Sequence, residues 1–123
     1  MKQTIPLRFN YEFSRVYKRG RYLTGTFVVV HFLKRRQGPD KNRFGVTASR
    51  SVQGSVRRNR LKRLIRESYR LQEGQLETGY DLIVTGRQTD PMPTFAQLDR
   101  ELGRILRRAG IRRPAEDGSG EKP

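Results

Sequence analysis

The feature that most constrains this chain is a run of like charge in a segment that has the composition of a helix. Residues 55–70 read SVRRNRLKRLIRESYR, with seven Arg or Lys side chains and one acidic side chain, Glu67. Like charges four residues apart destabilise an isolated helix by about 0.2–0.5 kcal/mol per pair, although Arg, Lys and Leu are good helix formers. The helix therefore needs either a buried apolar face or an anionic partner that offsets the repulsion.

The spacing of the apolar residues in this segment predicts an amphipathic helix. At about 100° per residue, one face carries an apolar seam made of Leu61, Leu64, Ile65 and Ser68. Another face is widely cationic and contains the row Lys62, Arg66 and Arg70, with Asn59 and Arg63 beside it. We expect Ser55 to be the N-cap and Gly74 to follow the end of the helix.

The overall charge indicates the kind of partner. The chain has 27 Lys and Arg against 12 Asp and Glu, a formal net charge of +15 on 123 residues, and so strong a positive field attracts nucleic acid. The longest apolar run, residues 27–33, is too short to span a bilayer and is interrupted by His31. The first residues lack the apolar segment of a signal peptide, and the absence of cysteine is typical of a reducing compartment. We expect a cytoplasmic protein with no membrane association and no obligate protein partner.

Turn and periodicity signals divide the chain into six elements. A helix capped by Asn10 and ended by Gly20 is followed by strands over residues 22–33 and 43–48, which we expect to form an antiparallel hairpin around the turn at 35–42. After the loop at 49–54 come the basic helix and an apolar strand at 80–85. Thr94 and Gln97 form a capping-box pattern that opens a last helix, and Gly110 ends it.

The order αββαβα contains one β–α–β crossover, which runs through the basic helix. It predicts an α+β two-layer sandwich, with the helices on one side of a small sheet. We expect a single domain over residues 1–113. Residues 114–123, PAEDGSGEKP, have no apolar anchor and are predicted to be a disordered tail.

Residues 44–70, FGVTASRSVQGSVRRNRLKRLIRESYR, resemble the signature of the bacterial ribonuclease P protein subunit. That signature is a strand ending in Gly-x-x-x-Ser-basic, followed by an Arg-Asn-Arg helix with x-Lys-Arg-x-x-Arg after it. Residues 58–67 match without a gap, and the first helix is similar too, with Phe13 and Tyr17 at the aromatic positions and Gly20 after a basic pair. The chain departs from the pattern at Ser51, where the family usually has a second basic residue, and at Gln53-Gly54, where the glycine is displaced by one position.

The resemblance implies a protein cofactor of a large catalytic RNA that removes the 5′ leader from precursor tRNA, with Mg²⁺ held mainly by RNA. It also implies a left-handed β–α–β crossover. The basic helix and the loop before it would contact the catalytic RNA, through Arg50, Arg57, Arg58, Asn59, Arg60, Lys62, Arg63, Arg66 and Arg70. A cleft between the first helix and the sheet would take the single-stranded leader, through Phe13, Tyr17, Val30 and His31. Aromatic side chains beside a basic groove suit this task, because every base has a π-face.

Several of these residues have a second interpretation. Phe13 and Tyr17 have the spacing of core residues, and Asn59 is either merely tolerated in the helix or bonded to RNA or to the loop backbone. Arg58 and Arg60 lie about 200° apart on a helix, so we expect one of them to brace the loop and the other to meet RNA.

The polypeptide lacks the pattern of a protein nuclease, which needs clustered carboxylates or a His-centred acid–base pair. Its acidic residues are scattered, it has one histidine, and it has no cysteine. The sequence therefore predicts a subunit of a ribonucleoprotein endoribonuclease that has no catalytic side chain and no metal ligand of its own. A ribosomal-type structural RNA-binding protein and a DNA-binding regulator are the alternatives.

Overall fold

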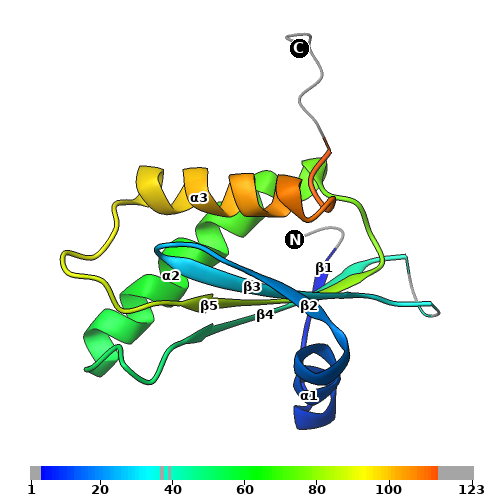
Figure 1. Cartoon of the computed structure of the whole chain (residues 1–123), viewed down its shortest axis with the longest axis horizontal. Helices are drawn as coiled ribbons and strands as arrows, with labels where there is room; N and C mark the ends of the chain where they lie inside the picture. Colours follow the sequence, from blue (N-terminus) through cyan, green and yellow to red (C-terminus); the bar gives the residue numbers. More distant parts are fainter. Residues whose placement is uncertain (1–3, 37, 39, 114–123) are drawn as a thin grey trace, which may run out of the picture.

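The structure, a computed structural model, describes residues 4–36, 38 and 40–113. These residues form a mixed sheet covered by helices (Figure 1). The elements in chain order are β1 (Thr4–Pro6), α1 (Asn10–Arg19), β2 (Arg21–Thr24), β3 (Val28–Lys34), β4 (Asn42–Ala48), α2 (Ser55–Gln72), the 3₁₀ turn η1 (Glu73–Gln75), β5 (Tyr80–Gly86) and α3 (Phe95–Arg108). The predicted α+β class is confirmed, and the predicted disordered tail, 114–123, lies outside the described residues.

The sheet corrects the predicted hairpin. The strand order is β1-β4-β5-β3-β2, so β5 lies between β3 and β4, antiparallel to β3 and parallel to β4. The reason is the composition of β5, in which the consecutive residues Leu82, Ile83 and Val84 are all buried. A strand that is apolar on both faces is stable at the centre of a sheet. The parallel β4–α2–β5 crossover has the predicted connectivity, and its left-handed sense stays a prediction.

The predicted strand at 22–33 is two strands, β2 and β3, joined by a tight turn. The carboxylate of Glu101, in α3, accepts hydrogen bonds from the backbone N–H groups of Thr26 (2.7 Å), Phe27 (2.7 Å) and Val28 (3.0 Å) in this turn. The turn is thus fixed by a residue more than seventy positions away, which local sequence signals cannot indicate. The short edge strand β1 was also missed, because its three residues have no strand periodicity.

Helices cover both faces of the sheet, so the expectation of helices on one side is wrong for α1. The main core lies between α2, α3 and the face that carries Val30, Phe32 and Leu82. A smaller cluster of Leu7, Val16 and Ile83 lies under α1. Because successive residues of a strand point to opposite faces, Leu82 and Ile83 belong to different layers, and Figure 1 shows α1 on one side of the sheet with α2 and α3 on the other.

The predicted helix boundaries agree with the structure to within one or two residues. The capping box of Thr94 and Gln97 is present, since each side chain accepts the backbone N–H of the other. Helix α2 has Gly54, with a φ of +88°, as its N-cap, and Ser55 is its first helical residue. Within the described part of the chain, none of the helices combines the length and apolarity that crossing a bilayer requires.

Candidate nucleic-acid interface

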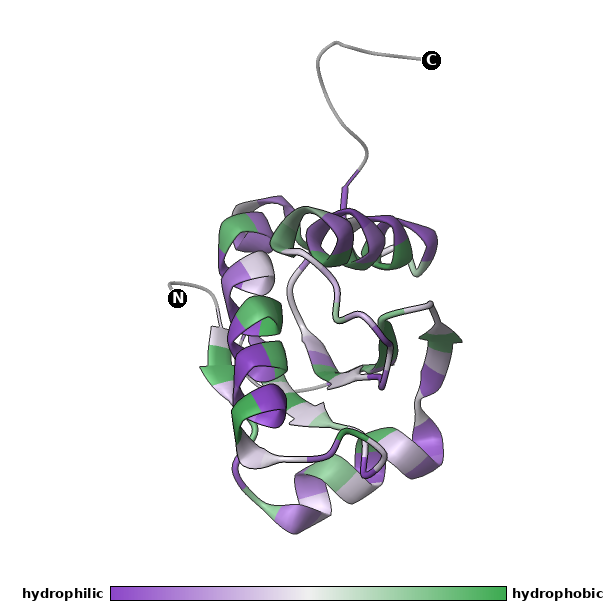
Figure 2. Cartoon of the chain, turned by 90° about the vertical axis from the view of Figure 1, so that its left-hand side faces the viewer, coloured by the Kyte–Doolittle hydropathy of each residue, from purple (hydrophilic) through white to green (hydrophobic). Residues whose placement is uncertain are grey.

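Helix α2 buries its apolar seam and exposes most of its charge. Leu61, Ile65 and Tyr69 are buried, and the Tyr69 ring stacks on Phe44 of β4 at 4.0 Å between centroids. Ser68, which is also on the seam, donates a hydrogen bond of 2.7 Å to Asp99 of α3. The predicted RNA-contacting side chains that this packing leaves exposed are Arg50, Arg57, Asn59, Arg60, Arg63, Arg66 and Arg70, while Lys62 is half-buried. Figure 2 shows hydrophilic and hydrophobic residues alternating along α2.

Arg58 braces the loop before α2, so of the two arginines it is the one that has this role, while RNA contact by Arg60 stays a prediction. The Arg58 guanidinium donates hydrogen bonds to the backbone carbonyls of Ala48 (3.1 Å), Ser49 (2.8 Å) and Val52 (3.2 Å). Val52 anchors the loop in the main core. Arg58 thus shapes the surface that presents the neighbouring arginines, while Arg60 faces solvent.

The departure at Ser51 has a structural counterpart in this loop. The hydroxyl oxygens of Ser49 and Ser51 are 2.9 Å apart, and the backbone N–H of Ser51 donates to Ser49 Oγ at 3.3 Å. Ser51 therefore ties the loop to itself at the point where the resembled signature has a second basic residue, and the neighbouring Arg50 is an exposed cation.

Two other residues of the predicted RNA-contacting set are Arg70 and Asn59. Arg70 forms an exposed ion pair of 2.6 Å with Glu67, and this hydrogen bond lowers the pKa of Glu67. Asn59 is exposed, and within the described part of the chain its amide makes no hydrogen bond to the loop. Of the three interpretations of Asn59, bonding to the loop backbone is therefore excluded.

On the other face of the sheet, three rings gather beside α1. Tyr17 contacts His31 edge-to-face at 4.8 Å, and Tyr22 stacks over the same imidazole at 5.3 Å. The side chains of Tyr17 and Tyr22 are 46% and 63% exposed, so Tyr17 is not a core residue. The sequence did not indicate a role for Tyr22, which faces His31 across the β2–β3 pairing. This pairing exists only because the segment predicted as one strand, 22–33, is two strands joined by a turn.

The prediction that Val30 lines the cleft is wrong. Val30 is 0% exposed and lies in the main core under α2 and α3, because strand alternation points it away from the face that His31 occupies. The side chain next to His31 on its own face is Val29, which pairs with Thr85 of β5, and Thr85 pairs with Thr47 of β4. These three side chains are half-buried and continue the open face of the sheet beyond α1.

Phe13 is partly a core residue and partly accessible. Its ring packs against the small cluster under α1, and a Cβ placed on Gly45 would lie 2.8 Å from it, so only glycine leaves room for the ring there. Phe13 also lines a depression of about 400 Å³ together with Val46 of β4 and Arg66 of α2. This depression brings an aromatic residue of α1 and a cation of α2 to the same place.

Burial lowers the pKa of His31 below its ordinary value. The Nδ1 atom is buried and has no hydrogen-bond partner among the described residues, so an added proton there would lack an acceptor. At neutral pH the ring is therefore an uncharged surface between two tyrosines, suited to stacking.

The two buried carboxylates on the α1 side do not suit Mg²⁺. Asp81 is paired with Arg35 at 2.7 Å and with Arg43 at 2.8 Å, and Glu12 is paired with Arg43 at 2.6 Å. Burial raises the pKa of Glu12, but hydrogen bonds from the backbone N–H groups of Arg8 and Phe9, together with Arg43, outweigh it and lower the pKa. Among the described residues no group of three or more His, Asp or Glu side chains is placed to hold a metal ion.

The fold and these surfaces define a small basic α+β domain of the nucleic-acid-binding class, with a cationic helix on one face of the sheet and a cluster of exposed aromatic rings on the other. The sequence model of the family described as Ribonuclease P matches residues 1–110. The chain belongs to the ribonuclease P protein family.

Relatives and solved structures agree with this assignment. The chain is 36% identical to the ribonuclease P protein component of Clostridium novyi over 111 residues, which cover 90% of this chain and 98% of that protein. It is 39% identical to the component of Clostridium botulinum over 106 residues, with 85% and 94% covered. The RNase P protein of Staphylococcus aureus superposes with a TM-score of 0.78 at 28% identity, covering 88% and 97% of the two chains. For the Thermotoga maritima protein the TM-score is 0.74 at 31% identity, with 84% and 96% covered.

Proposed function

We propose that this chain is the protein subunit of ribonuclease P, which binds a catalytic RNA and the 5′ leader of precursor tRNA and promotes removal of the leader. The observation that carries the proposal is the presence of two kinds of surface, the exposed cations of α2 and the exposed rings beside α1, with Phe13 and Arg66 lining one depression between them. A cationic helix suits a structured RNA backbone, and an open aromatic cleft suits a single strand.

The exposed arginines of α2 are the contacts for the catalytic RNA. Arg57, Arg60 and Arg63 project from a helix whose other side is packed in the main core, so they are held on a rigid support. Each phosphate that they neutralise releases counterions, and this release dominates the affinity of such interfaces. Arg58 contributes indirectly, by holding the loop that carries Arg50.

The cleft binds the leader by stacking and by its open sheet face. Tyr17, His31 and Tyr22 form a continuous aromatic surface, and base stacking on such rings tolerates many sequences. Val29, Thr47 and Thr85 extend this surface with short side chains over which a strand can lie. Phe13 contributes its exposed edge, and the rest of its ring supports α1.

Catalysis belongs to the RNA and its Mg²⁺ ions. Asp81 and Glu12 are neutralised by arginines, and His31 is held neutral in an aromatic environment, so these groups fit no metal-ion or acid–base role. Mg²⁺ supplies charge neutralisation and activation of water when bound by the RNA, and the polypeptide positions RNA and leader. A cytoplasmic location follows from this role.

Reconstitution tests the proposal. The purified chain is combined with a bacterial ribonuclease P RNA and a precursor tRNA at low Mg²⁺, where stabilisation of the complex by the protein has its largest effect. We expect faster cleavage at the mature 5′ end than with the RNA alone. A ribosomal-type RNA-binding protein would bind RNA without this stimulation, and equal rates with and without the chain would overturn the proposal.

A further inference from the structure

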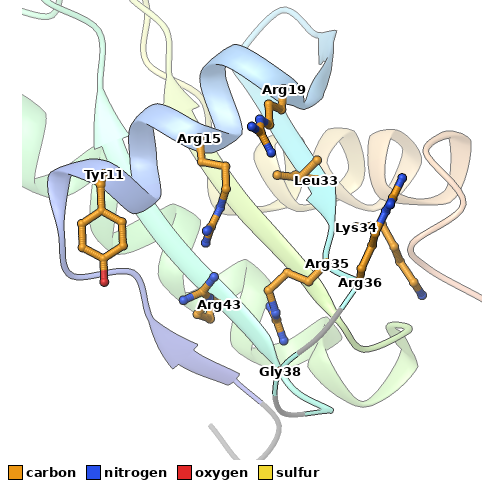
Figure 3. Close-up of a pocket in the computed structure, with 9 residues that line it drawn as sticks. All are labelled: Tyr11, Arg15, Arg19, Leu33, Lys34, Arg35, Arg36, Gly38 and Arg43. Carbon is orange, nitrogen blue, oxygen red and sulfur yellow. The ribbon is translucent and has the colours of Figure 1, made fainter.

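A basic hollow lies between α1 and the residues Arg35, Arg36 and Gly38 that follow β3. It has a volume of about 820 Å³, and Figure 3 shows the residues of α1, β3 and β4, together with Arg35, Arg36 and Gly38, that surround it. Its cationic lining consists of Arg15, Arg19, Lys34, Arg35, Arg36 and Arg43. The α2 surface and the aromatic cleft do not account for this cluster.

The hollow keeps a large positive excess after its internal ion pairs are counted. Buried Asp81 pairs with Arg35, Arg43 and, at 3.5 Å, Arg15, and Glu12 pairs with Arg43. Six cations against these two carboxylates leave a net charge of about +4. Arg19 and Arg36 are exposed and have no acidic partner within the described part of the chain. Cations crowded in this way repel one another unless an anion joins them.

The ion pairs also pre-organise the hollow. The Arg43 guanidinium reaches both oxygens of Asp81 at 2.8 Å, and the side chains of Arg35 and Arg43 are only 8% and 17% exposed. Arginines held in this way lose little side-chain entropy when they meet a phosphate. The surface is therefore a built concavity with a fixed floor and two free cations at its rim.

An aromatic surface stands at one end of the hollow. Tyr11 lines it and stacks on Phe9 at 5.4 Å with an interplanar angle of 8°, and both rings are more than half exposed. Cations beside exposed rings match a nucleotide, whose phosphate and base are both attached to one sugar. This combination favours a strand of RNA over a free inorganic anion.

The hollow is separate from the leader cleft. At about 100° per residue, Arg15 and Arg19 lie about 160° around α1 from Tyr17, so the two surfaces occupy opposite flanks of this helix. Helix α2 packs on the other face of the sheet. We propose that the hollow is a third RNA-contact surface, which binds backbone phosphates through its arginines and stacks a base on Tyr11. The proposal depends on the proposed function only for the identity of the RNA that supplies the strand.

The first test uses the full chain and a single-stranded oligouridylate, with affinity measured against salt concentration. The variant Arg19→Gln/Arg36→Gln removes two exposed cations that hold nothing else in place. We expect the slope of log K against log[salt] to become shallower by about 0.7 for each lost phosphate contact. The matched control is Arg100→Gln/Arg108→Gln on α3, which removes the same charge from exposed positions elsewhere. A change no larger than that of the control overturns the proposal.

Tyr11→Ala tests the stacking part independently. We expect the affinity for oligouridylate to fall about tenfold with the salt slope unchanged, because stacking releases no counterions. An unchanged affinity overturns base stacking on Tyr11. Thermal melts of all variants should match the wild type, since the substituted side chains are exposed.

Two further arms identify the source of the strand. If the arginine variant weakens assembly with the ribonuclease P RNA, the hollow binds that RNA. If it weakens holoenzyme binding of precursor tRNA but not of mature tRNA, the hollow binds the leader. Either result supports a third RNA-contact surface. If the arginine variant loses no more affinity than the control in both arms, the proposal is overturned for the holoenzyme. A wild-type chain that fails to stimulate cleavage would contradict the proposed function, while the oligouridylate measurement would still decide on the hollow.

Discussion

Arginine occupies three kinds of environment in this molecule, with different consequences for its removal. Arg58 is half-buried and bonded to three carbonyls of the loop, whereas Arg43 joins two buried carboxylates. Arg60 and Arg63 project from α2 into solvent. Counting cations therefore overstates the number of RNA contacts, because part of the charge holds the fold together.

Arg58→Ala and the pair Arg60→Ala/Arg63→Ala should separate these roles. Removing Arg58 removes hydrogen bonds to the carbonyls of Ala48, Ser49 and Val52, and we expect a loss of about 1–3 kcal/mol in the free energy of unfolding. The double variant should melt like the wild type but flatten the salt dependence of binding to the catalytic RNA, by about 0.7–0.9 per phosphate contact. Thermal melts and salt titrations distinguish them. A stable Arg58→Ala protein, or a double variant with the wild-type slope, would contradict the assignment.

Tyr17→Ala should affect the leader alone. One stacking contact is worth about 1–3 kcal/mol per base, so the holoenzyme should bind precursor tRNA more weakly and bind mature tRNA almost unchanged. The melting temperature should change little, since Tyr17 is a half-exposed residue, whereas truncating a core aromatic costs about 3–5 kcal/mol. Equal losses for both tRNAs together with a large drop in melting temperature would make Tyr17 a structural residue.

The single histidine should make stability depend on pH just below neutrality. Because burial lowers the pKa of His31 below 6.5, the unfolded chain binds a proton more readily than the native one. The stability that neutral His31 contributes is complete above pH 6.5 and is lost as the pH falls from there through the lower native pKa. Urea denaturation of the wild type and of His31→Phe between pH 7.5 and 5 measures this. The variant should lose less stability over this range, and parallel curves would count against the lowered pKa.

At the scale of elements, long-range contacts decide where the strands begin, end and pair. The turn between β2 and β3 is held by one carboxylate of α3, which accepts three backbone N–H groups. Helix α3 thereby fixes the position of β2, which carries Tyr22 against His31. An element on one face of the sheet thus helps to position an exposed aromatic residue on the other.

Glu101→Gln tests this link. The amide offers one oxygen and one donor group where three donors converge, and hydrogen bonds to a charged group are worth about 1.5–3 kcal/mol each. We expect a loss of about that size in the free energy of unfolding, measured with urea. The control Glu77→Gln affects a carboxylate whose contact with Arg113 is exposed and 3.9 Å long, and it should change stability by well under 1 kcal/mol. Similar values for the two variants would exclude Glu101 as the anchor of the turn.

At the scale of the whole molecule, the sheet lies between Tyr17 and the exposed Arg60 and Arg63 of α2, whereas Phe13 and Arg66 line one depression. Contributions from sites more than about 7–10 Å apart that share no partners add to within about 0.3–0.5 kcal/mol. Tyr17→Ala should therefore leave the affinity for the catalytic RNA unchanged. Arg60→Ala/Arg63→Ala should leave the ratio of precursor to mature tRNA affinity unchanged once the holoenzyme is saturated with protein. Combining the three substitutions measures the coupling, and a value well above 0.5 kcal/mol would mean that the two surfaces act as one.

The sequence by itself determined the features that depend on local periodicity and composition. The seam of α2 at Leu61 and Ile65, the capping box of α3, the end of α1 at Gly20 and the cationic character of the α2 surface all follow from side-chain spacing, and the structure confirms them. The family resemblance at residues 58–67 has the same origin, since it is a contiguous motif.

Only the tertiary structure decided which residues meet across the sheet. It placed β5 between β3 and β4, because the strand that is apolar on both faces is most stable at the centre. It moved α1 to the opposite face, put Val30 in the core and brought Tyr22 to His31. It also placed the Arg58 guanidinium on the carbonyls of the loop, and it brought the arginines of α1 together with Arg35 and Arg36 around one hollow. These outcomes depend on contacts between residues distant in the sequence, whose free energies compete over the whole molecule and leave no periodic signal in any one segment.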